Sequence, residues 1–458
     1  MGNIFHAIDR MGGGFNPKRA FQNQSRYAKI PWTGISRSFK QDQSAEYHKP
    51  RRERREVMSG KRAIQSTRRG FLKTGLAGAA AFSLIKAESA HGAPANSKIE
   101  VGIIGSGGRG HYVSKKMMTN AEKDIQIVAA QDPFADRLES LGVAFDVDKS
   151  RWYQGVEAYH DLLALPLDAV AVTSPPYFHP EQVAAAVKAG KHVWLAKPVA
   201  VDAPGCQSIL ASAKQAEGRL TFLVDFQTRN SPAFKECVQR VHEGAIGELV
   251  MGHVYYHTGR LNPQAKPGMP ADEARLRNWV FDIPLSGDII VEQNVHVLDV
   301  ANWYIGAHPL KAFGTGGRKA RVDVGDCWDH FIVTYEYPNG VKVDFSSTQF
   351  VKGYDDMCIR MYGTQGTADS HYWGVIRITG DNPWHGTDRD NTMDTGVDNN
   401  VLDFVKAIRG NQPINHGAYA VETTLTGVLG RMAAYEGREV TWDDMLAKQE
   451  KFEVQLKL

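Results

Sequence analysis

The chain has 458 residues, of which 42% are hydrophobic and 23% charged, so it can bury a large core, and its length suits two domains better than one. Its formal net charge is only +3, and Lys and Arg are concentrated near the N-terminus, so the body offers no basic stripe for nucleic acid. The cysteines show neither a C-x-x-C pair nor another metal-ligand spacing, so we expect no metal site and small buried roles for Cys206, Cys237, Cys327 and Cys358.

A pair of arginines precedes an apolar stretch near the start of the chain. Residues 67–73 read Thr-Arg-Arg-Gly-Phe-Leu-Lys, and the apolar stretch that follows is shorter than the roughly 20 residues that a stable membrane span needs. This pattern resembles a bacterial twin-arginine export signal, which predicts a periplasmic protein cleaved between Ser89 and Ala93. Residues 1–57 are then a disordered or mis-assigned leader, and residues 58–93 are the signal peptide.

A glycine-rich turn follows the first expected strand. The apolar run Ile99–Ile104 leads into Gly-Ser-Gly-Gly-Arg-Gly, and a helix is expected from His111. This is G-x-G-x-x-G between strand and helix, where the first glycine permits the turn, the second lets the backbone approach a pyrophosphate, and the third lets helix pack on strand. The expected cofactor contacts here are Gly105, Ser106, Gly107, Gly108, Arg109 and Gly110.

The second expected strand, Ile125–Ala130, leads to an acidic residue. Asp132 follows it, at the distance from the glycine turn where an acid hydrogen-bonds the ribose hydroxyls of a dinucleotide. A carboxylate there also repels a 2′-phosphate, which favours NAD over NADP. Arg137 is a second expected cofactor contact and is the residue that leaves NADP open.

Three further helix–strand pairs complete this half of the chain. They predict an α/β fold with a doubly wound parallel sheet, a Rossmann domain over residues 94–226, and ligands at the carboxyl ends of the strands. Two loops at those ends, 174–180 and 196–198, should face the cofactor. The expected helices are Gly155–Leu163, Pro180–Ala189 and Ala203–Ala216, and the expected strands are Ala169–Thr173, His192–Ala196 and Leu220–Asp225. The further expected cofactor contacts are Thr173, Ser174, Pro175, His179 and Lys197.

Residues 227–458 are expected to form an α/β domain for substrate binding and oligomerisation. Residues 286–299 predict a mostly buried helix on which Glu292, His296 and Asp299 share one face. The Asn-Gly pair at 339–340 predicts a hairpin turn between two strands. The expected strands are Glu248–His257, Leu310–Thr315, His330–Tyr337, Val341–Ser347, Cys358–Gly363 and Val375–Thr379, and helices Val401–Arg409 and Ala420–Glu436 are expected to pack back on the first domain.

Together these motifs resemble the Gfo/Idh/MocA oxidoreductase family, named for glucose-fructose oxidoreductase and inositol dehydrogenase, over about residues 98–455. The family pattern combines G-x-G-x-x-G, a loop with prolines and His, E-K-P, and G-G-x-x-x-x-D-x-G-x-H-x-x-D. Here Ala196 stands for the Glu of E-K-P, Glu292 for an Asp and Asn294 for a Gly. The resemblance implies an open, largely antiparallel sheet in the second domain and a homodimer or homotetramer.

The resemblance implies hydride transfer between NAD(H) and a sugar, glycoside or cyclitol. We expect His296 to take the hydroxyl proton, with Glu292 or Asp299 setting its tautomer. Lys197 would stabilise the developing alkoxide or share the proton relay, and the sequence does not separate these two roles.

Substrate contacts are expected from residue types that bind sugars, because aromatic faces stack on pyranose rings and polar side chains bond hydroxyls. The candidates are Arg260, Asn262, Trp384 and Tyr256. Two other functions stay open: a glycosidase or lyase that oxidises a ring carbon transiently with tightly bound NAD, and a non-catalytic NAD-binding sensor.

Overall fold

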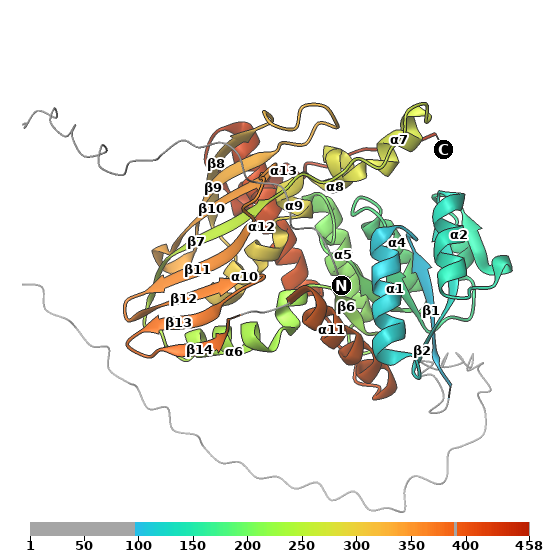
Figure 1. Ribbon diagram of the computed structural model, residues 1–458, viewed down its shortest axis with the longest axis horizontal. Helices are drawn as coiled ribbons and strands as arrows, with labels where there is room; N and C mark the ends of the chain where they lie inside the picture. The colour runs from blue at the N-terminus through green and yellow to red at the C-terminus, as the bar shows by residue number, and fades with distance from the viewer. Residues whose placement is uncertain (1–96, 389–391, 458) are drawn as a thin grey trace, which may run out of the picture. The chain divides into compact units, whose positions relative to one another are not determined.

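The computed structural model describes residues 97–388 and 392–457 (Figure 1). The expected leader, signal peptide and cleavage site lie outside these residues. Among the helices of the described ranges, none combines the length and the apolar character that crossing a membrane requires.

The first half of the described chain folds around a parallel sheet. Its six strands lie in the order β3-β2-β1-β4-β5-β6. The order reverses between β1 and β4, which creates a crevice at the carboxyl ends of these strands. This confirms the predicted doubly wound Rossmann fold. The strands are β1 (Ile99–Ile104), β2 (Ile125–Asp132), β3 (Trp152–Gln154), β4 (Ala169–Val172), β5 (His192–Leu195) and β6 (Phe222–Val224).

Helices connect these strands, and three of them begin elsewhere than predicted, one of them, α4, by a single residue at His179 rather than Pro180. The first helix starts at Gly108 rather than His111, because the amide of His111 already bonds to the carbonyl of Gly107 (3.0 Å). The third starts at Tyr159, because Gly155 has φ +131° and cannot be helical. The helices are α1 (Gly108–Ala121), α2 (Ala135–Ala144), α3 (Tyr159–Leu163), α4 (His179–Lys188), α5 (Ala203–Ala216) and α6 (Pro232–His242).

The second half is built on a mixed sheet of nine strands within the described residues, in the order β14-β13-β12-β11-β7-β10-β9-β8-β15. Only β7 and β10 are parallel neighbours. The predicted turn at Asn339-Gly340 joins β9 to β10, and both residues have positive φ. The strands are β7 (Leu249–Thr258), β8 (Lys311–Gly317), β9 (His330–Glu336), β10 (Lys342–Gln349), β11 (Asp356–Gly363), β12 (Gly366–His371), β13 (Ile376–Gly380), β14 (Trp384–Thr387) and β15 (Val440–Thr441).

Helices pack against one face of this sheet, where alternate strand residues such as Val254, Phe345 and Ile359 are fully buried. Helix α11 lies instead against α1, where Tyr112 donates to Asp394 (3.1 Å) and Lys116 pairs with Asp398 (2.9 Å). The remaining helices are α7 (Ala271–Arg277), α8 (Ile283–Ser286), α9 (Ile289–Glu292), α10 (Val295–Ile305), α11 (Thr392–Arg409), α12 (Gly417–Glu436) and α13 (Trp442–Lys448).

The single helix predicted across residues 286–299 is wrong, because this range holds the last residue of α8, all of α9 and the start of α10. Helix α9 ends at Glu292 and α10 begins at Val295. Between them the amide of Asn294 bonds to the carbonyl of Ile289 (2.9 Å), five residues back rather than four. Such a π-type turn widens the helix by one residue and changes which side chains share a face.

Candidate active site

A cavity of about 1050 Å³ opens at the carboxyl ends of the parallel strands. The glycine turn after β1 lines one part of it, and Lys197, Glu292 and His296 line another. Residues between β7 and α8, among them Asn262 and Arg277, line it as well. The cavity therefore brings the predicted nucleotide motif and the predicted proton-handling residues into one space.

The glycine turn has the close contacts that a dinucleotide loop requires. Gly105 has φ +90°, and a Cβ on it would lie 2.5 Å from the amide nitrogen of Ser174. A Cβ on Gly110 would lie 2.3 Å from the carbonyl of Gly105, which also accepts a hydrogen bond from the Thr173 hydroxyl (2.7 Å). The backbone of Gly107 and Gly108 then faces the cavity at the N-terminus of α1, which suits a pyrophosphate.

Asp132 lies at the end of β2 and lines the same cavity. Its carboxylate accepts hydrogen bonds from the amides of Ser106 and Phe134, both at 2.9 Å. Burial raises the pKa of Asp132, and its side chain stays fixed beside the glycine turn. Arg137 also lines the cavity, with its guanidinium 5.0 Å from the ring centre of Phe134.

The loop after β4 divides into residues that line the cavity and one that supports them. Ser174 and Pro175 line it, and the Ser174 hydroxyl donates to Gln182 (2.5 Å). His179 is buried outside the lining, with its ring nitrogens 2.9 Å from the carbonyls of Ser174 and Pro198. Burial lowers the pKa of His179 to about 4, and the two carbonyls oppose that shift; a neutral ring, with one N–H, donates to only one of these carbonyls.

Lys197 is held by Glu292. Its Nζ donates to the carbonyl of Glu292 and lies 3.4 Å from the Glu292 carboxylate. Burial lowers the pKa of Lys197, and the neighbouring carboxylate opposes that shift. The side chain of Lys197 is 13% exposed, and it lines the cavity.

His296 lies in the same cavity on the first turn of α10. It is 7% exposed, and burial, together with the positive charges of Lys197 and Arg109, lowers its pKa well below the usual value. Its Nδ1 lies 3.5 Å from the hydroxyl of Tyr372, which donates to Gln227. Neither predicted carboxylate is bonded to His296 within the described residues, so the prediction that Glu292 or Asp299 sets its tautomer is not what the contacts show.

Asp299 lies outside this group. Its carboxylate receives two hydrogen bonds from Arg229 and one from Thr423, all at 2.8 Å, and the residue is fully buried. His296 and Asp299 are both in α10, so the turn before that helix does not separate them; the bonds from Arg229 and Thr423 hold the Asp299 carboxylate. Asp299 anchors the helix instead.

Of the four expected substrate contacts, two line the cavity and two do not. Asn262 and Tyr256 line the cavity. Arg260 is outside its lining and pairs with Asp323 at 2.5 Å on an exposed surface. Trp384 is on β14, also outside the lining, where its ring lies 5.2 Å from the guanidinium of Arg240.

Two contacts near His296 had no signal in the sequence. Tyr372 follows β12, a strand that was not predicted. Arg109 was expected as a cofactor contact, but its ion pair with the fully buried Asp225 was not. Asp225 also accepts from Asn400 (2.8 Å) on α11, and only the fold brings these segments together.

Comparison with known proteins agrees with this architecture. Residues 99–224 match the oxidoreductase family with an NAD-binding Rossmann fold, and residues 234–369 match the GFO/IDH/MocA C-terminal domain. The chain belongs to the Gfo/Idh/MocA oxidoreductase family.

Relatives of this Gfo/Idh/MocA chain include inositol dehydrogenases. It is 27% identical over 290 residues to inositol 2-dehydrogenase of Rhizobium meliloti, which covers 62% of this chain and 79% of that protein. It is 24% identical over 283 residues to scyllo-inositol 2-dehydrogenase (NAD(+)) of Bacillus subtilis, covering 61% and 75%. The apo structure of scyllo-inositol dehydrogenase from Lactobacillus casei shares the fold, with a TM-score of 0.61 at 18% identity, over 76% of this chain and 99% of that one.

The structure shows what replaces the Glu of the family's E-K-P motif, where this Gfo/Idh/MocA chain has Ala196. Ala196 has no carboxylate to offer Lys197, and its side chain is buried, with 6% exposed. Glu292, from the end of α9, places one beside the lysine instead. The lysine therefore has an anionic partner although the E-K-P motif is incomplete.

Proposed function

We propose that this chain is an NAD(H)-dependent oxidoreductase that acts on a hydroxyl or ketone of a sugar, glycoside or cyclitol, with Lys197 and His296 handling the proton. The observation that carries the proposal is the single cavity lined by both the glycine turn and the Lys197–Glu292–His296 group. The names of its relatives support a cyclitol or sugar substrate.

The cavity residues fit the cofactor. The amides at the N-terminus of α1 would hold the pyrophosphate, and the Asp132 carboxylate would meet the adenosine ribose and repel a 2′-phosphate, which favours NAD. Bound there, the nicotinamide accepts or donates the hydride of the reacting carbon.

The proton chemistry rests on residues of the chain itself. Because the pKa of His296 is lowered, its imidazole is neutral near pH 7 and can accept the hydroxyl proton. The ammonium of Lys197, held by Glu292, can donate a charge-assisted hydrogen bond to the same oxygen as negative charge develops on it.

Variants of the two residues test the roles directly. We expect Lys197→Met and His296→Asn each to lower kcat by about 10²–10⁴-fold, the usual contribution of a positioned acid or base. Arg260→Ala is the control, because Arg260 lies outside the cavity lining. All variants should retain bound nucleotide; full activity in either cavity variant would refute the assignment.

Nucleotide and product analysis tests the function as a whole. The protein from residue 94 is denatured and any released nicotinamide nucleotide identified, and the native enzyme is given a panel of cyclitols and glycosides. Released NAD and a product lacking two hydrogens would establish the dehydrogenase. Cleaved glycoside without net oxidation would favour the glycosidase or lyase, and bound NAD without turnover would favour a sensor.

Oligomerisation is the remaining part of the proposal. The face of the nine-stranded sheet that lies opposite the helices carries exposed apolar side chains, with Phe313 and Ile332 55% and 52% exposed. Such residues at the centre of a strand favour contact with another copy. We therefore expect a homodimer or homotetramer, which light scattering would distinguish from a monomer.

A further inference from the structure

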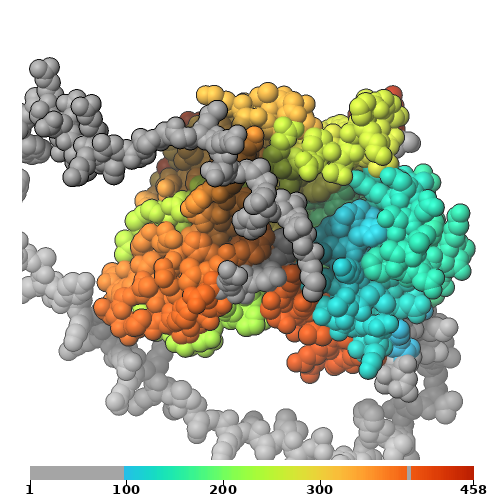
Figure 2. All heavy atoms as spheres, viewed as in Figure 1, coloured from blue at the N-terminus to red at the C-terminus, as the bar shows by residue number. Residues whose placement is uncertain are grey.

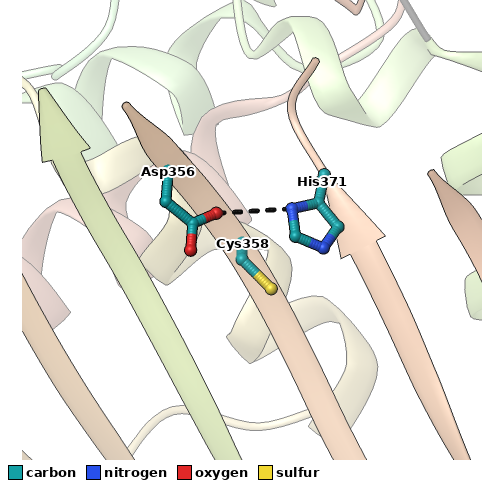
Figure 3. A group of neighbouring side chains, drawn as sticks. All are labelled: Asp356, Cys358 and His371. Atoms are coloured by element: carbon teal, nitrogen blue, oxygen red, sulfur yellow. Dashed lines mark ion pairs between the residues drawn. The ribbon is translucent and has the colours of Figure 1, made fainter. Parts of the chain in front are cut away.

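Three side chains of metal-ligating type meet on the mixed sheet, away from the cavity. Asp356 and Cys358 come from β11, and His371 ends β12 (Figure 3). One oxygen, the sulfur and one ring nitrogen all lie within 4.8 Å of one another. The cysteine spacing predicted no metal site, since it does not reveal ligands that only the pairing of two strands brings together.

The register of the strands explains why these residues converge. Cys358 and His371 are direct partners in the antiparallel pair of β11 and β12, and Asp356 is two residues from Cys358 on the same face. The imidazole Nδ1 of His371 lies 3.3 Å from Asp356. Cys358 is buried, whereas the side chains of Asp356 and His371 are 21% and 24% exposed, so an ion can reach the group from solvent.

The second ring nitrogen of His371 is already held. Its Nε2 lies 3.2 Å from the carboxylate of Asp369. Asp369 is in turn anchored by Arg360 at 2.9 Å and Arg377 at 3.3 Å. A carboxylate on the far nitrogen is the usual partner of a metal-bound histidine, because it fixes the ring and its tautomer.

The surroundings of the ring also favour positive charge. Carboxylates flank His371 on both sides, with Asp356 3.3 Å from Nδ1 and Asp369 3.2 Å from Nε2. A divalent cation between Asp356, Cys358 and His371 would replace the ring proton and the thiol proton, which leave to solvent as the ligand bonds form.

We propose that Asp356, Cys358 and His371 bind one divalent transition-metal ion of the zinc class, with a water molecule in the fourth position. Sulfur and imidazole ligands select such an ion over calcium or magnesium, which prefer oxygen alone. Tetrahedral zinc would set the ligand atoms about 3.5 Å apart. The three ligand atoms now lie within 4.8 Å of one another.

The site is separate from the cavity, because its ligands are on the other face of the sheet. Tyr372, the next residue after His371, directs its hydroxyl to His296 in the cavity. The group is also set apart from Ile332, where contact with another copy is expected, because β7 and β10 lie between β11 and β9 in the sheet. A metal ion would therefore tie β11 to β12 where Tyr372 leaves the sheet, and it is independent of the proposed hydride transfer.

Cobalt titration of the chelator-treated full-length protein tests the site. We expect one Co²⁺ per chain, with a near-ultraviolet absorption from the thiolate–cobalt bond. Cys358→Ser should lose that absorption, and Asp356→Asn should bind Co²⁺ more weakly. Both substitutions change the shape of the side chain little. His385→Ala is the matched control, because His385 is exposed on β14 of the same sheet and should bind as the wild type does.

Two further readouts keep the proposal falsifiable if a variant folds poorly. Zinc should raise the melting temperature of the wild-type protein, and Asp369→Asn should weaken cobalt binding by about 10–100-fold as the loss of an outer-shell carboxylate does. Wild-type protein without cobalt absorption, or absorption that persists unchanged in Cys358→Ser, would overturn the assignment.

Discussion

Lys197 and Glu292 come from different domains, and their contact sets the charge at the centre of the cavity. Burial alone lowers the pKa of Lys197, and the Glu292 carboxylate opposes that shift. If the cationic form of Lys197 stabilises the alkoxide, activity is lost as pH rises through its pKa. Glu292 then acts as a positioning residue that keeps the ammonium charged and aimed.

Glu292→Gln tests this role through a pH profile. Removing the carboxylate charge lowers the pKa of Lys197 further, so the alkaline limb of kcat should move to lower pH. Glu292→Asp should restore part of the wild-type profile. A variant whose kcat falls equally at every pH would instead mean that Glu292 serves only to shape the site.

The titration of His192 should make the stability of the fold depend on pH. It starts β5, its Nδ1 accepts from the amide of Thr221 (2.9 Å), and burial lowers its pKa to about 4. The unfolded chain takes up this proton near pH 6.5, whereas the folded chain does not until about pH 4. The stability contributed by neutral His192 is thus complete above pH 6.5 and is lost as pH falls toward 4.

His192→Asn keeps an acceptor near Thr221 and cannot titrate. Between about pH 7.5 and about pH 5, the wild type should lose roughly 2 kcal/mol more of its unfolding free energy than the variant. Urea unfolding at the two pH values measures this difference. The exposed control His385→Asn should lose as much as the wild type, and an equal loss in His192→Asn would contradict the argument.

At the scale of elements, the segment between β7 and α8 covers the nucleotide end of the cavity. Helix α7 contacts α2 through Arg277, which donates hydrogen bonds of 2.8 and 3.0 Å to Asp136. The Arg277 guanidinium also lies 4.0 Å from the ring centre of Phe134. Figure 2 shows this yellow-green segment against the blue-green surface of the first domain. The C-terminal residues support the segment as well, since the amide of Lys457 donates to Asp272 (2.8 Å).

This contact predicts slow release of the cofactor. Asp136 is 64% exposed, so solvent screens the pair and its loss should cost about 1 kcal/mol, which corresponds to roughly 5-fold faster release of NAD from Arg277→Ala. Stopped-flow displacement measures the rate. Arg275→Ala is the matched control, because Arg275 pairs with Asp282 at 2.6 Å inside the same segment. Identical rates in both variants would mean that α7 does not retain the cofactor.

Elements with a strong local sequence pattern were predictable, whereas elements that depend on pairing or packing with distant segments were not. Helix α5 begins and ends where the sequence predicts, because Asp202 caps it and its apolar face is regular. Strand β12 was missed because Gly-Thr-Ala-Asp-Ser-His has no apolar run, and its pairing with β11 and β13 creates it. The turn at Asn294 was missed because helical periodicity cannot reveal one inserted residue.

The candidate site divides in the same way. Lys197 and the glycine turn were predictable because each sits in a motif at the end of a strand, where the fold class places ligands. The partners Tyr372 and Arg229 were not, since they reach His296 and Asp299 from distant segments. Arg260 was expected at the substrate by residue type alone, and residue type does not determine on which side of a loop a side chain lies.

At the scale of the whole molecule, the proposed export constrains how the chain obtains its cofactor. The periplasm holds little free NAD, so an exported enzyme must carry its cofactor through the membrane, which the twin-arginine route allows because it moves folded proteins. The first described strand begins at Ile99, downstream of the expected cleavage before or at Ala93, so cleavage leaves the sheet intact. We therefore propose that the chain folds around NAD before export.

Substituting both arginines of the signal tests this proposal. Arg68→Lys with Arg69→Lys should leave the protein in the cytoplasm, whereas the same exchange at the upstream pair Arg54 and Arg55 should not change its location. Cell fractionation followed by mass analysis of the N-terminus would show the mature periplasmic form, and denaturing that form should release NAD. A periplasmic protein that releases no nucleotide would contradict the proposal that the chain folds around NAD before export.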